Sequence, residues 1–168
     1  MTPIGMILKV VKTAADTQGK SLEMEWKLLP QTDGTPPHIH PYASETYRVL
    51  EGMIEVSLND RWHQLHQGEE LTVPAGVPHT FRNPSEYVTR VYNIHAPAME
   101  FEGYFEDLGC MVTKLAGESQ ERLHMNFKTA TYLAMLMKKY SKEIVSVNPP
   151  DFIVSLLNFI GKARHFKI

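Results

Sequence analysis

The sequence predicts an all-β domain with a helical appendage: antiparallel strands over residues 1–98, arranged as a barrel or sandwich, then about three α-helices over residues 99–168. Two observations support this division. As far as residue 98, short segments of alternating apolar and polar residues end in turn residues, which is typical of an all-β fold. Beyond residue 98, the apolar residues take the spacing of amphipathic helices. A chain of 168 residues is long enough for one such domain with a substantial core.

The predicted strands are short and follow one another closely. Residues 21–29 have the clearest period of two, with an apolar face of Leu22, Met24, Trp26 and Leu28 and a charged face of Glu23, Glu25 and Lys27. This alternation is typical of a half-buried strand in an antiparallel sheet. The other predicted strands are residues 5–12, 45–50, 53–58, 61–66, 70–73, 78–82 and 87–95. Asn59 and Asp60 tolerate the backbone conformations of a two-residue hairpin loop, so we expect a hairpin there.

Three helical segments are predicted after residue 98. The first has the i, i+3, i+4, i+7 spacing of one helix face at Phe101, Tyr104, Phe105 and Leu108. Between residues 126 and 141 the same spacing recurs at Phe127, Ala130, Leu133, Ala134, Met137 and Tyr140. The third helix is predicted from Asn148 as the N-cap, with Pro149 at the first helical position and Asp151 in the first turn.

The body of this third helix, residues 152–160, is apolar nearly all round and must therefore be covered. The simplest interpretation is packing against the barrel or against a partner subunit, and we expect a homodimer. Membrane contact is the alternative, because Lys162, Arg164 and Lys167 follow the apolar run as in an interfacial anchor. The segment is too short to cross a bilayer, which takes roughly 20 residues.

The stretch from Gly34 to Asn83 contains the residues best suited to chemistry. Its first half reads Gly34-Thr-Pro-Pro-His38-Ile-His40-Pro-Tyr-Ala-Ser-Glu45, with Gly52 beyond, and its second half reads Gly68-Glu-Glu-Leu-Thr-Val-Pro74-Ala-Gly76-Val-Pro-His79-Thr-Phe-Arg-Asn83. Because side chains two apart share a face of a strand, His38 and His40 can grip one ion with two imidazoles. A later strand, which follows a Pro/Gly turn, supplies a third imidazole at His79.

Both halves of this stretch resemble the two motifs of the cupin superfamily. The first motif has a glycine, two histidines separated by one residue, a glutamate and a glycine; the second has a glycine, a proline, a glycine, a histidine and an asparagine. The resemblance implies a small antiparallel jelly-roll barrel over about residues 5–96. It also implies that His38, His40, Glu45 and His79 are metal ligands. Spacing alone shows only that the first two histidines can chelate together.

Three imidazoles and one carboxylate suit one divalent transition metal, with Fe(II) as first choice and Mn, Ni, Zn or Cu as alternatives. Four protein ligands on an ion that prefers six would leave two positions for water, O2 or a bidentate substrate. Glu45 could then act both as a ligand and as a general base.

Three further residues are candidates to line a pocket at this site. Tyr47 shares a strand face with Glu45, and Phe81 and Asn83 share one with His79. The alternative is that Tyr47 and Phe81 only fill the barrel, which we favour for Phe81 and leave open for Tyr47.

The remaining histidines are expected to lie outside the ligand group. His63 and His66 are three apart in a predicted strand, so they face opposite sides and are expected in solvent. His124 and His165 lie in the helical segment and are expected on the surface. His95 closes the last strand and could approach the barrel mouth, although we do not count it as a ligand.

Charge and cysteine content restrict the partners and the compartment. With 17 Lys and Arg against 19 Asp and Glu, the chain has no basic excess for nucleic acid or an anionic membrane. A small-molecule ligand fits better. Cys110 is the single cysteine, which excludes an internal disulfide, and we expect it to be buried as a small apolar residue. The first residues lack the pattern of a signal peptide, so a cytoplasmic protein is expected.

Two functions remain in competition. The first is a metal-dependent dioxygenase that acts on a small organic substrate able to chelate the ion through its own oxygens. The second is a metal-dependent module that binds or senses a small molecule without catalysis. No DNA-binding helix-turn-helix is apparent in the sequence, which weakens a transcription-factor version of the second. Fold resemblance alone does not choose between them.

Overall fold

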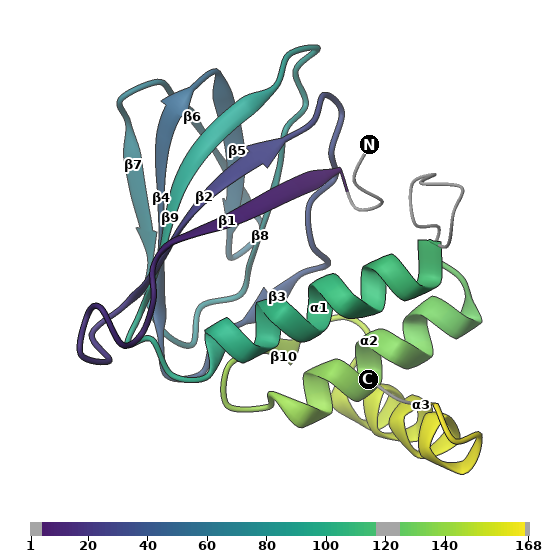
Figure 1. Ribbon diagram of the computed structural model, residues 1–168. Coiled ribbons are helices and arrows are strands. Elements are labelled where there is room, and N and C mark those ends of the chain that lie inside the picture. Colours follow the sequence, from purple (N-terminus) through teal and green to yellow (C-terminus); the bar gives the residue numbers. More distant parts are fainter. Residues whose placement is uncertain (1–4, 117–124, 167–168) are drawn as a thin grey trace.

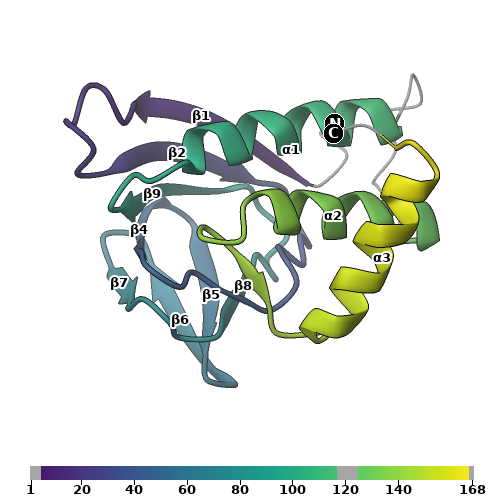
Figure 2. The same cartoon turned by 90° about the horizontal axis from the view of Figure 1, so that it is seen from below.

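The computed structural model describes residues 5–116 and 125–166. Within these ranges, two five-stranded antiparallel sheets face each other, and three helices lie together at one end of them (Figure 1). Figure 2 shows the helices from below, with α1 alongside β1 and β2. The predicted fold class, antiparallel strands followed by C-terminal helices, is confirmed.

The first sheet contains, in spatial order, β1 (Met6–Lys12), β2 (Leu22–Leu28), β9 (Thr89–Ala96), β4 (Ser44–Glu51) and β7 (Glu70–Val73). The second contains β10 (Val145–Ser146), β3 (His38–Ile39), β8 (His79–Arg82), β5 (Met53–Leu58) and β6 (Arg61–His66). The helices are α1 (Phe101–Ala116), α2 (Phe127–Lys139) and α3 (Asp151–Ala163). Each predicted strand of the first 98 residues is therefore present, with boundaries within two residues of the prediction.

The core lies between the sheets and follows the period of two in the sequence. The four apolar residues of β2 are buried, while its charged residues alternate on the outer face. Three aromatic rings meet between the sheets, with centroids 5.3 Å apart for Trp26 and Phe81 and 5.8 Å apart for Tyr47 and Phe81. The predicted hairpin is also present, because Asn59 and Asp60 have the positive φ angles of 47° and 64° that such a loop requires.

The helical segment is joined to the second sheet by a short strand that the sequence did not reveal. Val145 and Ser146 pair with Ile39 and His38, and the amide of Val147 donates to the carbonyl of Pro37 at 3.1 Å. The strand is followed by a bend over residues 147–149. The prediction that Asn148 is the N-cap is therefore wrong: α3 begins at Asp151 and its N-cap is Pro150.

The described chain covers only one side of the apolar third helix. One side of α3 packs on α2 and buries Val154 and Gly161. The opposite side leaves Phe152, Leu156 and Phe159 exposed by 72%, 57% and 68%. Cover by a partner subunit or a membrane surface therefore stays a prediction.

Two further expectations for the helices are wrong. Phe127 is 54% exposed, and the most deeply buried side chains of α2 are those of Thr131 and Leu136, because α2 packs between α1 and α3 and not against one neighbour only. Cys110 is exposed, because α1 turns its other side, with Met111 and Val112, toward the core. None of the described helices combines the length and the apolar character that a membrane crossing requires.

Candidate metal site

Three strands and the residue after one of them bring the four predicted ligands together. His38 lies in β3 and His40 directly follows it, Glu45 lies in β4, and His79 opens β8 as the pairing partner of His38. All four side chains are buried, with exposures of 2% to 4%. One ligand atom from each lies within 4.8 Å of the others. The sequence motif and the fold therefore agree on the same group of residues.

Each of the three imidazoles is oriented by a backbone carbonyl at its Nδ1 atom. These contacts join His38 to Pro36 at 2.9 Å, His40 to Glu143 at 2.6 Å and His79 to Val77 at 2.8 Å. A carbonyl oxygen only accepts hydrogen bonds, so each Nδ1 must carry the proton and donate it. In a neutral ring the Nε2 atom then presents a lone pair, which is the form that binds a metal.

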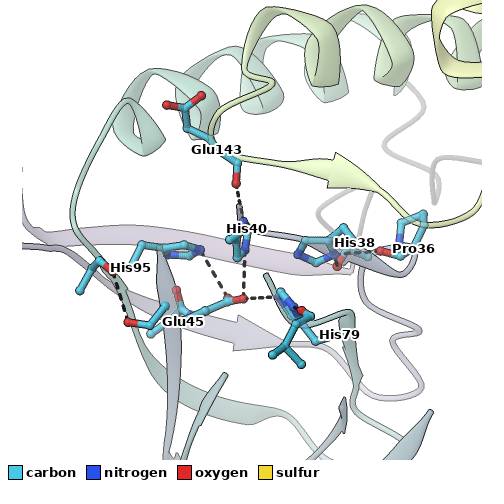
Figure 3. Close-up of polar contacts among 12 residues, drawn as sticks. Pro36, His38, His40, Glu45, His79, His95 and Glu143 are labelled. Atoms are coloured by element: carbon cyan, nitrogen blue, oxygen red, sulfur yellow. Dashed lines mark hydrogen bonds and ion pairs between the residues drawn. The ribbon is translucent and has the colours of Figure 1, made fainter. Parts of the chain in front are cut away.

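The contact that joins the helical segment to this site is the one to His40. Figure 3 shows His40 between the carboxylate of Glu45 and the carbonyl of Glu143. Glu143 follows α2 and lies 103 residues beyond His40 in the chain. The C-terminal segment therefore helps to orient a predicted ligand directly.

The two oxygens of Glu45 have different partners. Oε2 lies 3.2 Å from Nε2 of His40 and 2.9 Å from Nε2 of His79. Oε1 accepts a hydrogen bond of 2.8 Å from Nδ2 of Asn93, and Nε2 of His95 lies 3.5 Å away. Asn93 thus holds one oxygen and leaves the other directed at the imidazoles.

The contacts of Oε2 point to a cation. If both imidazoles are neutral, Oε2 and the two Nε2 atoms all carry lone pairs and repel one another unless a proton or a metal ion lies between them. A proton can bridge only one oxygen and nitrogen pair, whereas one metal ion can satisfy all the converging atoms. Neighbouring ligand atoms at right angles, each about 2.1 Å from one ion, are about 3.0 Å apart, close to the contacts of Oε2. The residues therefore fit a metal.

The charges of the site are consistent with this fit. Burial raises the pKa of the Glu45 carboxyl, but the neighbouring imidazoles of His95, His40 and His79 together lower it by more, so that it lies well below its usual value. Burial, followed by the charges of His79 and His40, holds the pKa of His38 well below its usual value. Burial also lowers the pKa of His79, but the hydrogen bond and charge of Glu45 raise it more. An ionised carboxylate therefore faces a neutral His38.

Asn93 is a functional candidate that the sequence reasoning missed, and His95, which that reasoning placed near the barrel mouth and outside the ligand group, is a second candidate. In the pairing of β4 with β9, His95 lies opposite Glu45 and Asn93 lies opposite Tyr47. Both side chains are buried, and burial above all lowers the pKa of His95 to about 3. The sequence did contain a signal, namely the alternation of side chains along this strand. Asn93 and His95 occupy the inward positions that continue the buried face of Val91.

The other candidates differ in their surroundings. Phe81 lines a small cavity of about 40 Å³ beside His38, His40 and Glu45, whereas Tyr47 is fully buried between the sheets and does not line it. Asn83 is buried, and its amide donates to three carbonyls, including Leu28 at 3.2 Å and Tyr87 at 2.8 Å. As predicted, His63, His66 and His165 are exposed, while His124 lies outside the described residues.

The chain thus has a two-sheet antiparallel fold, and three histidines and one glutamate that could hold a metal ion lie between the sheets. Residues 24–95 match the cupin domain family Cupin_2. These residues therefore form a cupin domain, as the motifs predicted.

Parts of the chain are similar in sequence to known proteins. It is 35% identical over 80 residues to quercetin 2,3-dioxygenase of Bacillus subtilis (strain 168), which is 48% of this chain and 23% of that protein. It is 27% identical over 93 residues to the HTH-type transcriptional regulator PuuR of Escherichia coli (strain K12), which is 55% of this chain and 49% of that protein. The chain therefore spans less than half of each of these curated relatives.

A solved structure shares the fold over a similar fraction of this chain. TT1209 from Thermus thermophilus superposes with a TM-score of 0.52 and 27% identity, over 58% of this chain and 88% of that chain.

Proposed function

We propose that the chain binds one divalent transition metal through His38, His40, Glu45 and His79 and oxidises a small organic molecule with O2, as a dioxygenase does. The observation that carries the proposal is the convergence of three Nε2 atoms and one carboxylate oxygen on one point, each imidazole held by a carbonyl behind it. The partial similarity to quercetin 2,3-dioxygenase supports the choice of reaction class.

The bound ion would supply the electron transfer to O2 that no side chain of the site can perform, which favours Fe(II) over a d10 ion such as Zn(II). The protein supplies a fixed ligand arrangement and a dry surrounding. Phe101 of α1 packs over the site, with ring centroids 5.0 Å from His40 and 4.3 Å from His95. Water is thus restricted on the side where α1 lies.

Glu45 would have two roles in this reaction. As an ionised ligand it balances the charge of the cation. If a chelating substrate takes the place of Oε2, the freed carboxylate can accept the proton of a substrate hydroxyl, while Asn93 still holds Oε1 at 2.8 Å. His95, with Nε2 3.5 Å from the same oxygen, is the nearest further group.

The test combines metal analysis with oxygen consumption. Protein without a histidine tag, loaded with Fe(II), is given a panel of small diketones, enediols and catechols, and we expect O2 uptake with at least one of them. Zn(II)-loaded protein should show none. Glu45→Gln keeps the shape and loses the charge, so it should lower turnover more than metal content.

The alternative is a metal-dependent binding or sensing module, which the partial similarity to the regulator PuuR favours. Under this alternative, small ligands bind the metal-loaded protein tightly, but no metal supports turnover. That result would replace the dioxygenase proposal. A chain that holds no metal at all after loading would contradict both.

A further inference from the structure

A second, larger cavity lies outside the two sheets, between them and the helices. Its volume is about 240 Å³. The segment from Thr32 to Pro36, which leads into β3, forms one wall, and α1 and α2 form the other through side chains such as Leu108 and Leu133. Figures 1 and 2 show α1 and α2 side by side along this end of the sheets.

This cavity adjoins the small cavity at the metal site. Five residues line both spaces: Met6, Thr35, Tyr104, Leu108 and Ile144. One of them, Thr35, has its hydroxyl 3.3 Å from Nδ1 of His38. A molecule in the larger cavity would therefore lie one layer of side chains away from the predicted ligands.

The lining of the larger cavity selects for apolar, uncharged molecules. No lysine, arginine or histidine is among its described lining residues, and the one carboxylate, Asp33, is exposed. Four methionines contribute, namely Met6, Met111, Met125 and Met137. Methionine side chains adapt to the shape of an apolar guest. A volume somewhat below the usual range for drug-sized ligands indicates a small guest.

One polar group in this lining is available to a ligand. Tyr104 is 5% exposed, and within the described part of the chain its hydroxyl makes no hydrogen bond. Burial, and after it the charge of Glu45, raises the pKa of Tyr104, so the hydroxyl stays protonated and can donate. An oxygen atom of a molecule bound in the cavity can therefore accept a hydrogen bond from this hydroxyl.

We infer that the larger cavity is a binding site for a neutral, mostly apolar organic molecule of one or two rings, whose hydroxyl or carbonyl oxygen hydrogen-bonds to Tyr104. Because the two cavities share a wall, a molecule bound here would lie next to the metal site. We call this position a vestibule of the metal site. Binding in the cavity needs no metal, whereas the role as a vestibule rests on the proposed function.

The test uses 2-naphthol and naphthalene as matched probes, measured by calorimetry on the full-length chain without metal and with Zn(II). We expect one molecule of 2-naphthol per chain in both states. Tyr104→Phe should weaken 2-naphthol about threefold to tenfold, the usual range for one hydrogen bond, and leave naphthalene unchanged. Equal effects on the two probes would refute the role of Tyr104.

A second pair of variants tests the place of binding. Leu133→Trp fills the cavity from α2, and Leu133 does not line the metal-site cavity, so both probes should lose at least tenfold in affinity. Leu156→Trp makes the same exchange at a side chain of α3 that is 57% exposed, and binding should not change. Circular dichroism establishes that each variant is folded. The site is refuted if folded Leu133→Trp binds like the wild type, or if the wild type binds neither probe.

A third measurement separates this inference from the proposed function. Mn(II) in the metal site should broaden the proton resonances of bound 2-naphthol, because the two cavities share a wall, and Zn(II) should not. Binding without such broadening would refute the vestibule and keep the binding site. Probe binding in a chain that consumes no O2 would refute only the dioxygenase.

Discussion

The proposed metal site leads to a quantitative prediction about the thermal stability of the chain. A ligand that binds only the folded chain at 100 times its Kd stabilises it by about 2.7 kcal/mol. For a chain of this size, 1 kcal/mol shifts Tm by roughly 2–4 °C. Saturation with a divalent transition metal should therefore raise Tm by about 5–11 °C, and a chelator should reverse the shift.

His40→Ala should remove most of this shift. The side chain is 4% exposed and presents Nε2 to the site, with Nδ1 held 2.6 Å from the Glu143 carbonyl. Loss of a residue that only hydrogen-bonds to a metal ligand costs about 10–100-fold in metal affinity. Loss of the ligand itself should therefore cost at least about 100-fold. At the same metal concentration the gain then falls to about 0.4 kcal/mol, or roughly 1–2 °C.

His63→Ala is the matched control, because His63 is exposed on β6 and belongs to no ligand group. It should keep the full shift. Differential scanning fluorimetry with metal and with chelator measures the shift, and elemental analysis after gel filtration measures metal content. The shift is compared within each variant, because His40→Ala also changes the stability of the metal-free chain. Equal shifts and equal metal content in the two variants would refute the ligand assignment.

Three other predictions concern the helices. Gly109→Ala should raise stability by about 0.5–1 kcal/mol, since no heavy atom lies near its added Cβ. Gly161→Ala should lower Tm, because its added Cβ would lie 3.0 Å or less from side-chain atoms of α2. Equal effects of the two substitutions would contradict the packing of α3. The hydrogen bond from Lys139, the largest of several causes, lowers the pKa of Asp107, so its stabilisation is present above the unfolded value of 3.8 and is lost as the pH falls through the lower folded value. Asp107→Asn should therefore lower Tm at neutral pH and match the wild type in strong acid, and a gap that persists there would contradict this. Cys110 should react with one equivalent of a thiol reagent in the native state, and reaction only after denaturation would contradict its exposure.

Much of the fold could be predicted because its signals are local. The period of two in residues 21–29 states which side chains face the core, and the structure buries those same residues. The pair Asn59 and Asp60 determines a loop by its own backbone preferences. The helices were found for the same reason, since their apolar spacing is contained within single segments.

The errors concern segments whose surroundings are set by distant parts of the chain. The start of α3 was placed too early because the pairing of Val145 and Ser146 with β3 and a bend over residues 147–149 come before the helix. Cys110 and Phe127 were misplaced because periodicity indicates that a helix has an apolar face, but the number and direction of its neighbours decide which side chains that face includes.

The sequence by itself determined which residues are able to form the metal site. The spacing of two histidines in one strand showed that they can chelate together, and the resemblance to the two cupin motifs added the glutamate and the third histidine. Only the tertiary structure decided how they are held. The partners of their Nδ1 atoms are backbone carbonyls, and because every residue has one, no residue type marks Glu143 as the partner of His40. The pairing of β4 with β9 likewise placed His95 and Asn93 at Glu45, since strand register depends on contacts across the whole sheet.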